Sequence, residues 1–243
     1  MSLAHRAGHG AAGTAADILA AALADALTPG GGTFTLRAGL DGRVDPVRAL
    51  GALRGTGADV LAPFLLGGHP FTASDAALVR AAVTAFPAPE PRTSDDAAWA
   101  PRDAALTQAL AALGVPTHGW EGLAADRHTA LTGPVALPDP TAWTAWTAEA
   151  VRLSALALPP VTGTLRERFG AHPPALVNGL VHALLRRDHL AAARTARWLA
   201  LDAGTTPDPL LTAALTHLTS LGPHRPRTLF ELAVARRLLG GAG

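Results

Sequence analysis

The sequence predicts an all-α or predominantly α protein built from stacked antiparallel helical hairpins, with one small β-hairpin near residues 33–44 as the exception. Three observations predict this class. Apolar residues recur at three- and four-residue spacing through much of the 243-residue chain. N-cap residues, Pro and Gly separate these segments. The links between the last segments are short, which favours antiparallel neighbours.

The chain divides into four regions by composition and pattern. Residues 1–13 are rich in Gly, Ala and His, and we expect a flexible tail there. Residues 14–113 are predicted to form a mostly helical N-terminal region, and residues 114–138 an irregular connecting segment. Residues 139–243 are predicted to hold the C-terminal helical hairpins. One continuous domain over residues 14–243 is the alternative.

The first helix is expected from Thr14 to about Leu27, because Thr28-Pro-Gly follows it. Residues 34–38 then alternate between apolar and polar types, and Asp41-Gly42 is a frequent hairpin turn pair. These two features predict the small β-hairpin.

The next helices begin at recognisable caps. Asp45-Pro46 combines an N-cap acceptor with Pro at the first helical position. Thr72 and Asp75 resemble a capping box and predict a helix to about Phe86. Pro101 is expected to open a further helix. The apolar residues 60–66 contain a Pro and are predicted to form a short helix or a buried turn.

The C-terminal region shows the clearest helical periodicity. A helix after Asp139-Pro140 places Trp143 and Trp146 on one face, where core packing and stacking on an aromatic ligand are the two interpretations. Four more helices are predicted over residues 174–187, 189–202, 208–221 and 226–239.

Composition excludes several kinds of chemistry. The chain has no Cys and no Tyr, and all 20 of its Lys and Arg residues are Arg. A lysine Schiff base, a Walker lysine, a thiol nucleophile, a thiolate metal site and a disulfide are therefore excluded. Abundant Ala, Gly, Pro and Arg indicate a GC-rich coding sequence, typical of a high-GC bacterium.

The charge balance gives no sign of a nucleic-acid partner. The net charge is +1, with 20 basic against 19 acidic residues, and the basic clusters are short. We also expect no membrane partner, because no run of about 18 apolar residues is free of charge and Pro. A cytoplasmic location is the default expectation, with a protein partner or a small-molecule ligand.

The loop at residues 118–128 holds the densest mixture of titratable and aromatic groups. His118, Glu121, Asp126 and His128 are the catalytic candidates if the protein is an enzyme, because His and carboxylate pairs perform acid–base chemistry near neutral pH. Trp120 is a candidate ligand-binding residue. The competing interpretation is a solvated linker in which Trp120 fills a gap in the core.

A second candidate surface is the polar face of the helix at residues 174–187. Asn178, His182 and Arg186 lie opposite its apolar stripe, with Arg187 and His189 just beyond. This ridge could bind an anionic ligand or a partner's carboxylates. A hydrated outer helix face is the alternative.

No metal site and no cofactor is identified from the sequence. His5 and His9 have helical ligand spacing, but they stand in the expected flexible tail. Two functions are weighed. The first is a helical protein-interaction or accessory module. The second is an α-helical small-molecule enzyme of specialised metabolism that uses His, Asp and Arg in acid–base chemistry. A cofactor protein with a His ligand is a weaker third hypothesis, without a supporting motif.

Overall fold

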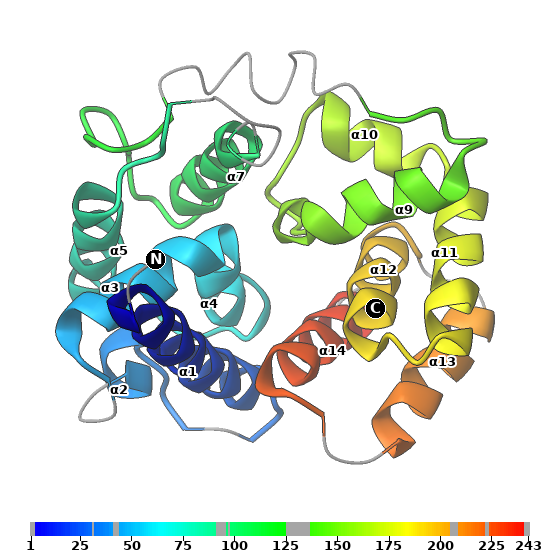
Figure 1. The fold of residues 1–243 in the computed structure, drawn as a ribbon, viewed down its shortest axis with the longest axis horizontal. Coiled ribbons are helices and arrows are strands. Elements are labelled where there is room, and N and C mark those ends of the chain that lie inside the picture. The colour runs from blue at the N-terminus through cyan, green and yellow to red at the C-terminus, as the bar shows by residue number, and fades with distance from the viewer. Residues whose placement is uncertain are drawn as a thin grey trace.

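The computed structural model confirms the all-α class. It describes residues 3–30, 32–40, 44–90, 96, 98–124, 137–204, 209–221 and 224–240, with side chains from Ala15 onward, and these ranges contain no β-strand. The helical elements, labelled as in Figure 1, are α1 (Leu3–Ala26), α2 (Leu36–Leu40), α3 (Pro46–Thr56), the 3₁₀ helix η1 (Gly57–Leu61), α4 (Ala62–Leu66), α5 (Ala73–Ala85), α7 (Trp99–Ala112), α9 (Trp143–Arg152), the 3₁₀ helix η2 (Ser154–Leu156), α10 (Thr164–Gly170), α11 (Pro173–Leu185), α12 (His189–Leu201), α13 (Pro209–Ser220) and α14 (Pro226–Gly240).

The helices follow one another around a ring (Figure 1). α5 packs on α3, α3 on α1, α1 on α14, α14 on α12, α12 on α11, and α11 on α9. The ring closes where α7 contacts both η1 and η2. α11 and α12 form one of the predicted hairpins. The division at residues 114–138 stays a prediction, although α1 and α14 bring the two ends of the fold together.

The predicted helix caps are confirmed at two positions. The carboxylate of Asp45 accepts hydrogen bonds from the backbone nitrogens of Val47 and Arg48, at 3.1 and 3.2 Å. At the start of α5, the Thr72 hydroxyl accepts from the Asp75 nitrogen at 3.2 Å, and the Asp75 carboxylate accepts from the Thr72 nitrogen at 3.1 Å. Each cap satisfies backbone donors that the first helical turn leaves without a partner.

The β-hairpin predicted near residues 33–44 is wrong, because Leu36–Leu40 forms the short helix α2. Its two leucines, four residues apart, both point into the core. The Leu36 nitrogen donates to Asp75 Oδ1 at 2.9 Å, and the Phe34 nitrogen donates to His69 Nδ1 at 3.3 Å. These side chains take the backbone donors that a strand partner would have taken.

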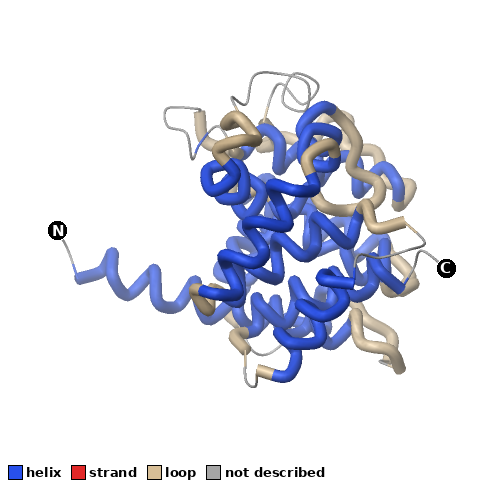
Figure 2. Tube along the Cα trace, turned by 90° about the vertical axis from the view of Figure 1, so that its right-hand side faces the viewer, coloured by secondary structure: helices blue, strands red, loops and turns tan. Residues whose placement is uncertain are grey.

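Three helix starts differ from the prediction. α1 begins at Leu3 instead of after Thr14, so residues 3–13, where a tail was expected, are helical. Figure 2 shows this part extending away from the rest of the molecule, and its flexibility stays a prediction. α7 begins at Trp99, which places Pro101 in its first turn, where proline is tolerated. α9 begins at Trp143.

Aromatic side chains fill the core of the C-terminal helices. Trp146 is fully buried, and its ring centroid lies 5.2 Å from that of Phe169. Phe169 in turn lies 4.8 Å from Trp198, whose Nε1 donates to the Ala150 oxygen at 2.7 Å. The core interpretation of Trp146 is therefore confirmed. Trp143 is only partly buried.

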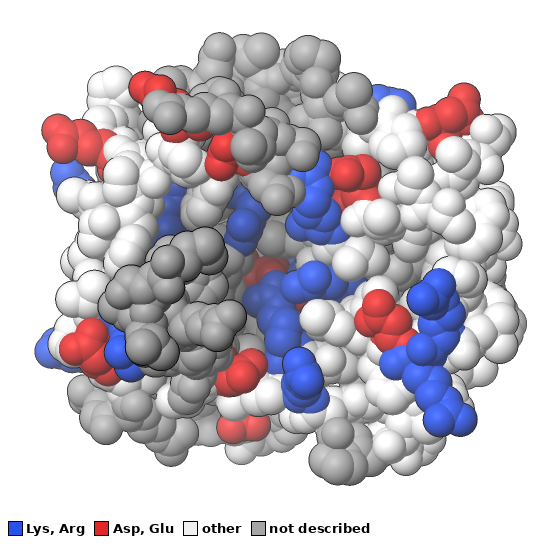
Figure 3. Space-filling model, viewed as in Figure 1, with Lys and Arg blue, Asp and Glu red and all other residues white. Residues whose placement is uncertain are grey.

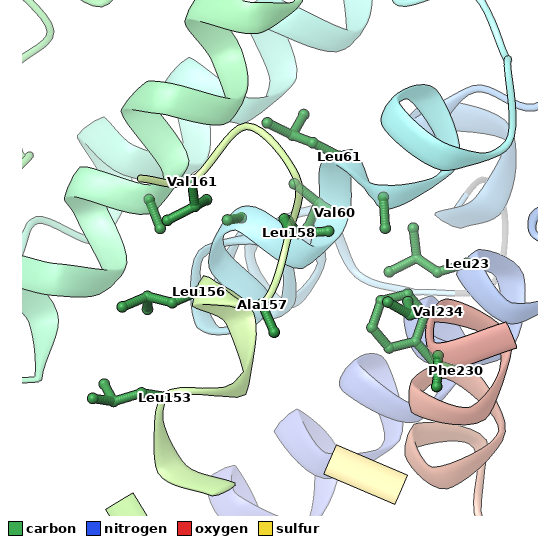
Figure 4. Close-up of a cluster of buried hydrophobic side chains, with 14 of the residues drawn as sticks. Leu23, Val60, Leu61, Leu153, Leu156, Ala157, Leu158, Val161, Phe230 and Val234 are labelled. Carbon is green, nitrogen blue, oxygen red and sulfur yellow. The ribbon is translucent and has the colours of Figure 1, made fainter. Parts of the chain in front are cut away.

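A second part of the core lies where the elements of the ring meet. Figure 4 shows apolar side chains of η1 and of the segment at residues 153–161 together with Leu23 of α1 and Phe230 of α14. Pro46–Leu66, which comprises α3, η1 and α4, is long and apolar enough to cross a membrane. However, 67% of the 18-residue apolar window within it is buried inside the protein, as in a core helix. The described residues contain no second stretch of this kind.

Candidate anion-binding site

The ring surrounds a cavity that is open to solvent and lined by arginines. Its volume is about 1150 Å³, which is above the range of about 300–1,000 Å³ that is usual for small-molecule sites. In Figure 3, arginine side chains in blue surround a hollow at the centre of this face. Arginine is the one charged residue type in the described lining, which comprises Ala16, Val47, Arg48, Gly51, Ala52, Gly55, Thr56, Phe86, Trp99, Arg102, Arg152, Ser154, Ala155, Arg194 and Arg227.

Two buried carboxylates hold part of this lining in place. Asp59 of η1 and Glu231 of α14 are fully buried. Arg197 of α12 lies between them, with Nη1 2.7 Å from Asp59 Oδ1 and 3.0 Å from Glu231 Oε2. Arg227 of α14 is ion-paired with Asp59, and its Nη2 is 3.0 Å from Glu231 Oε1. Arg194 of α12 contacts the same Oε1 through Nε, at 3.1 Å.

Two members of this network, Glu231 and Arg227, are ionised at physiological pH. Burial alone would raise the pKa of Glu231, but the charges of Arg227, Arg197 and Arg194 lower that pKa to about 2. Burial likewise opposes the charge of Arg227, yet its carboxylate partners raise its pKa above the ordinary value. A carboxylate so acidic is a poor general base. Glu231 therefore positions the arginines and takes no part in proton transfer.

A second buried ion pair supports the opposite wall. Arg54 of α3 and Asp103 of α7 form a bidentate pair in which Nη2 and Oδ2 are 2.9 Å apart. Asp103 Oδ2 also accepts from the Ala124 nitrogen at 2.8 Å, and Arg54 Nε donates to the Phe86 oxygen at 2.8 Å. The Arg54 guanidinium lies 4.5 Å from the centroid of Trp99. This pair fixes α3, α7 and the end of α5 relative to one another.

Arg102 is a partly buried arginine of the cavity lining. Its Nη2 donates to the Gly55 oxygen, and it forms no ion pair with a carboxylate in the described residues. Burial lowers the pKa of Arg102 and the like charges of Arg227 and Arg54 lower it further, whereas Asp59 raises it. A negative ligand beside Arg102 would raise this pKa, because an opposite charge favours the charged guanidinium.

Positive charge is in excess among the described residues around the cavity. Of these residues, seven arginines line it or lie directly behind it, against four carboxylates, and this set is Arg48, Arg54, Arg102, Arg152, Arg194, Arg197 and Arg227 with Asp59, Asp103, Glu149 and Glu231. A concave site with one sign of excess charge concentrates ions of the opposite sign. Guanidinium groups also match the oxygen geometry of phosphates and carboxylates.

The structure does not bring the described candidates of the predicted loop, His118, Trp120 and Glu121, to this cavity. His118 and Glu121 are exposed, and neither belongs to the cavity lining. Trp120 is 8% exposed and lies 6.0 Å from the Arg80 guanidinium, which agrees with its interpretation as a core residue. Asp126 and His128 lie outside the described residues.

The second predicted surface lies on the outer side of α11. Asn178, His182, Arg186 and Arg187 are all exposed, and none belongs to the cavity lining. The ring of His182 lies 5.2 Å from that of Trp143. His189 is half-buried, and its ring lies 5.1 Å from the ring of His224. A binding role for these residues stays a prediction.

Sequence reasoning missed the residues of the cavity. One signal was present, because Arg227 and Glu231 stand four residues apart on a predicted helix and Arg194 and Arg197 stand three apart. Residues spaced in this way are usually solvent-exposed. Only the packing of α12 and α14 shows that Arg197 and Glu231 are fully buried.

Comparisons with known proteins add no family. No protein-family model, curated protein sequence or solved structure matches the chain. Within the described residues, no group of three or more His, Asp or Glu side chains could hold a metal ion.

Proposed function

We propose that the protein is a helical binding module that holds a small, multiply charged anion in the arginine cavity. One observation carries this proposal, namely the convergence of Arg102, Arg152, Arg194 and Arg227 on one cavity whose described lining contains no carboxylate. The guanidinium groups of these side chains match a ligand that carries two phosphate or carboxylate groups. A cytoplasmic location in a GC-rich bacterium belongs to the same proposal.

The geometry supports binding better than acid–base catalysis. The described lining contains no His, Asp or Glu, and the hydroxyl of Ser154 in this lining donates to the buried Glu231 at 3.5 Å. An enzyme of the kind considered from the sequence needs a group that titrates near neutral pH. A role as an interaction module remains compatible with this site if the bound anion belongs to a partner.

Isothermal titration calorimetry with pyrophosphate at low ionic strength tests the proposal. We expect saturable one-site binding, and we expect Arg102→Gln to weaken it at least about tenfold, because one charge-assisted hydrogen bond contributes about 1.5–3 kcal/mol. Arg37→Gln is the matched control, because Arg37 is exposed on α2 and lies outside the described lining. Absence of binding, or equal weakening in both variants, would overturn the proposal.

A further inference from the structure

One wall of the cavity follows a single face of α3. Val47, Gly51 and Gly55 stand four residues apart and all belong to the lining. At 1.5 Å per residue, this face is about 12 Å long. A Cβ atom on Gly55 would meet nothing within 4 Å, so the wall is open there. A Cβ atom on Gly51 would lie 3.5 Å from the ring of Phe86, so that ring covers the middle of the wall.

The side chains along this wall change from apolar at its beginning to basic at its end. At its beginning and middle, Val47 and Phe86 keep 63% and 36% of their surface exposed although both line the cavity. At its end, Arg102 is bonded to the Gly55 oxygen. Arg48 stands beside Val47 and is itself exposed. An inorganic anion would occupy the Arg102 end and leave the two apolar side chains in water.

Resting on the proposed function, we propose that the natural occupant is an organic anion with an aromatic body, of the aryl phosphate class. Its phosphate group lies at Arg102, with Arg194 and Arg227 from the facing helices. Arg194 suits this role because only its Nε contacts Glu231, and its terminal nitrogens have no hydrogen-bond partner in the described chain. The aromatic body lies on Phe86 and Val47, where its burial removes apolar surface from water.

The length of the wall agrees with this class of ligand. An aromatic ring joined to a phosphate fits within about 12 Å of helix face, and the cavity volume of about 1150 Å³ leaves room for a second substituent. Gly55 lets the ligand approach the helix backbone closely, and the Phe86 ring over Gly51 offers a flat face for stacking. A bulky aliphatic group would fit against this wall less closely than a flat aromatic ring.

Calorimetric titrations of the full chain with phenyl phosphate and with inorganic phosphate test the inference. We expect phenyl phosphate to bind at least about tenfold more tightly. Phe86→Ala is expected to remove most of this difference and to leave inorganic phosphate unchanged. Val47→Ser, at a more exposed position where folding is not at risk, is expected to reduce the difference about threefold.

The outcomes separate the two proposals. Leu185→Ala on α11 is the matched control, because Leu185 is 79% exposed and lies outside the lining. Equal affinities for the two phosphates, or equal effects of Phe86→Ala on both, would overturn the aromatic ligand and leave anion binding intact. Failure of both phosphates and of pyrophosphate to bind would overturn the proposed function itself.

Discussion

Replacing Glu231 by Gln tests the buried network most directly, because it removes one charge and keeps the side-chain shape. The network lowers the pKa of Glu231 from 4.5 to about 2, a difference that corresponds to about 3 kcal/mol of folding free energy. Because the folded-state pKa is the lower one, this stabilisation is complete above pH 4.5 and is lost as the pH falls toward 2.

We expect Glu231→Gln to lower the free energy of unfolding at pH 7 by about 3–5 kcal/mol, because Arg197 and Arg227 then share Asp59 alone and Arg194 loses its carboxylate partner. The free energy of unfolding of the variant should also lack the part of its decrease at low pH that Glu231 causes in the wild type. Urea unfolding at pH 7 and at steps from pH 5 to about 2.5 measures both effects. Glu149→Gln is the control, because its pair with Arg152 is about 30% exposed and contributes less than about 1 kcal/mol. Equal losses in the two variants, or parallel pH profiles for Glu231→Gln and the wild type, would refute the reasoning.

Two further substitutions test the packing. Gly179→Ala in α11 should destabilise the fold by about 1–3 kcal/mol, although alanine is the better helix former, because the new Cβ would lie 2.7 Å from Thr147 Cβ. Adding Thr147→Ala should restore part of the loss in thermal unfolding, and the absence of any recovery would count against the clash. Arg54→Met should cost about 3–5 kcal/mol because it leaves the buried carboxyl group of Asp103 without its ion-pair partner. The double variant with Asp103→Leu should be more stable than Arg54→Met in urea, and a less stable double variant would contradict this.

Local signals in the sequence were sufficient for most of the helices. Asp45, Thr72 and Asp75 act as caps because each bonds to a donor within three residues, and such contacts are legible from spacing. The error at Leu36 has the opposite cause. Its nitrogen bonds to Asp75, 39 residues away, and a two-residue period cannot reveal a partner at that distance.

The candidate site could not be predicted for the same reason. Asp59 meets Arg227 across 168 residues of sequence, and Arg54 meets Asp103 across 49. Each of these residues alone reads as an ordinary charge on a helix. The loop around His118 has its mixed residues next to one another in the sequence, whereas the arginines that line the cavity come from five separate helices.

The contact between α1 and α14 has a consequence for synthesis on the ribosome. Leu19 and Leu23 of α1 are fully buried, and α14 packs against this helix. The Arg237 side chain of α14 also donates to the Leu27 oxygen at 2.6 Å, just beyond the end of α1. A nascent chain that has emerged only as far as α12 therefore exposes apolar surface and an incompletely paired Asp59. The ring of helices cannot be completed before α14 has been synthesised. Until then, chaperones and proteases have access to the exposed segments.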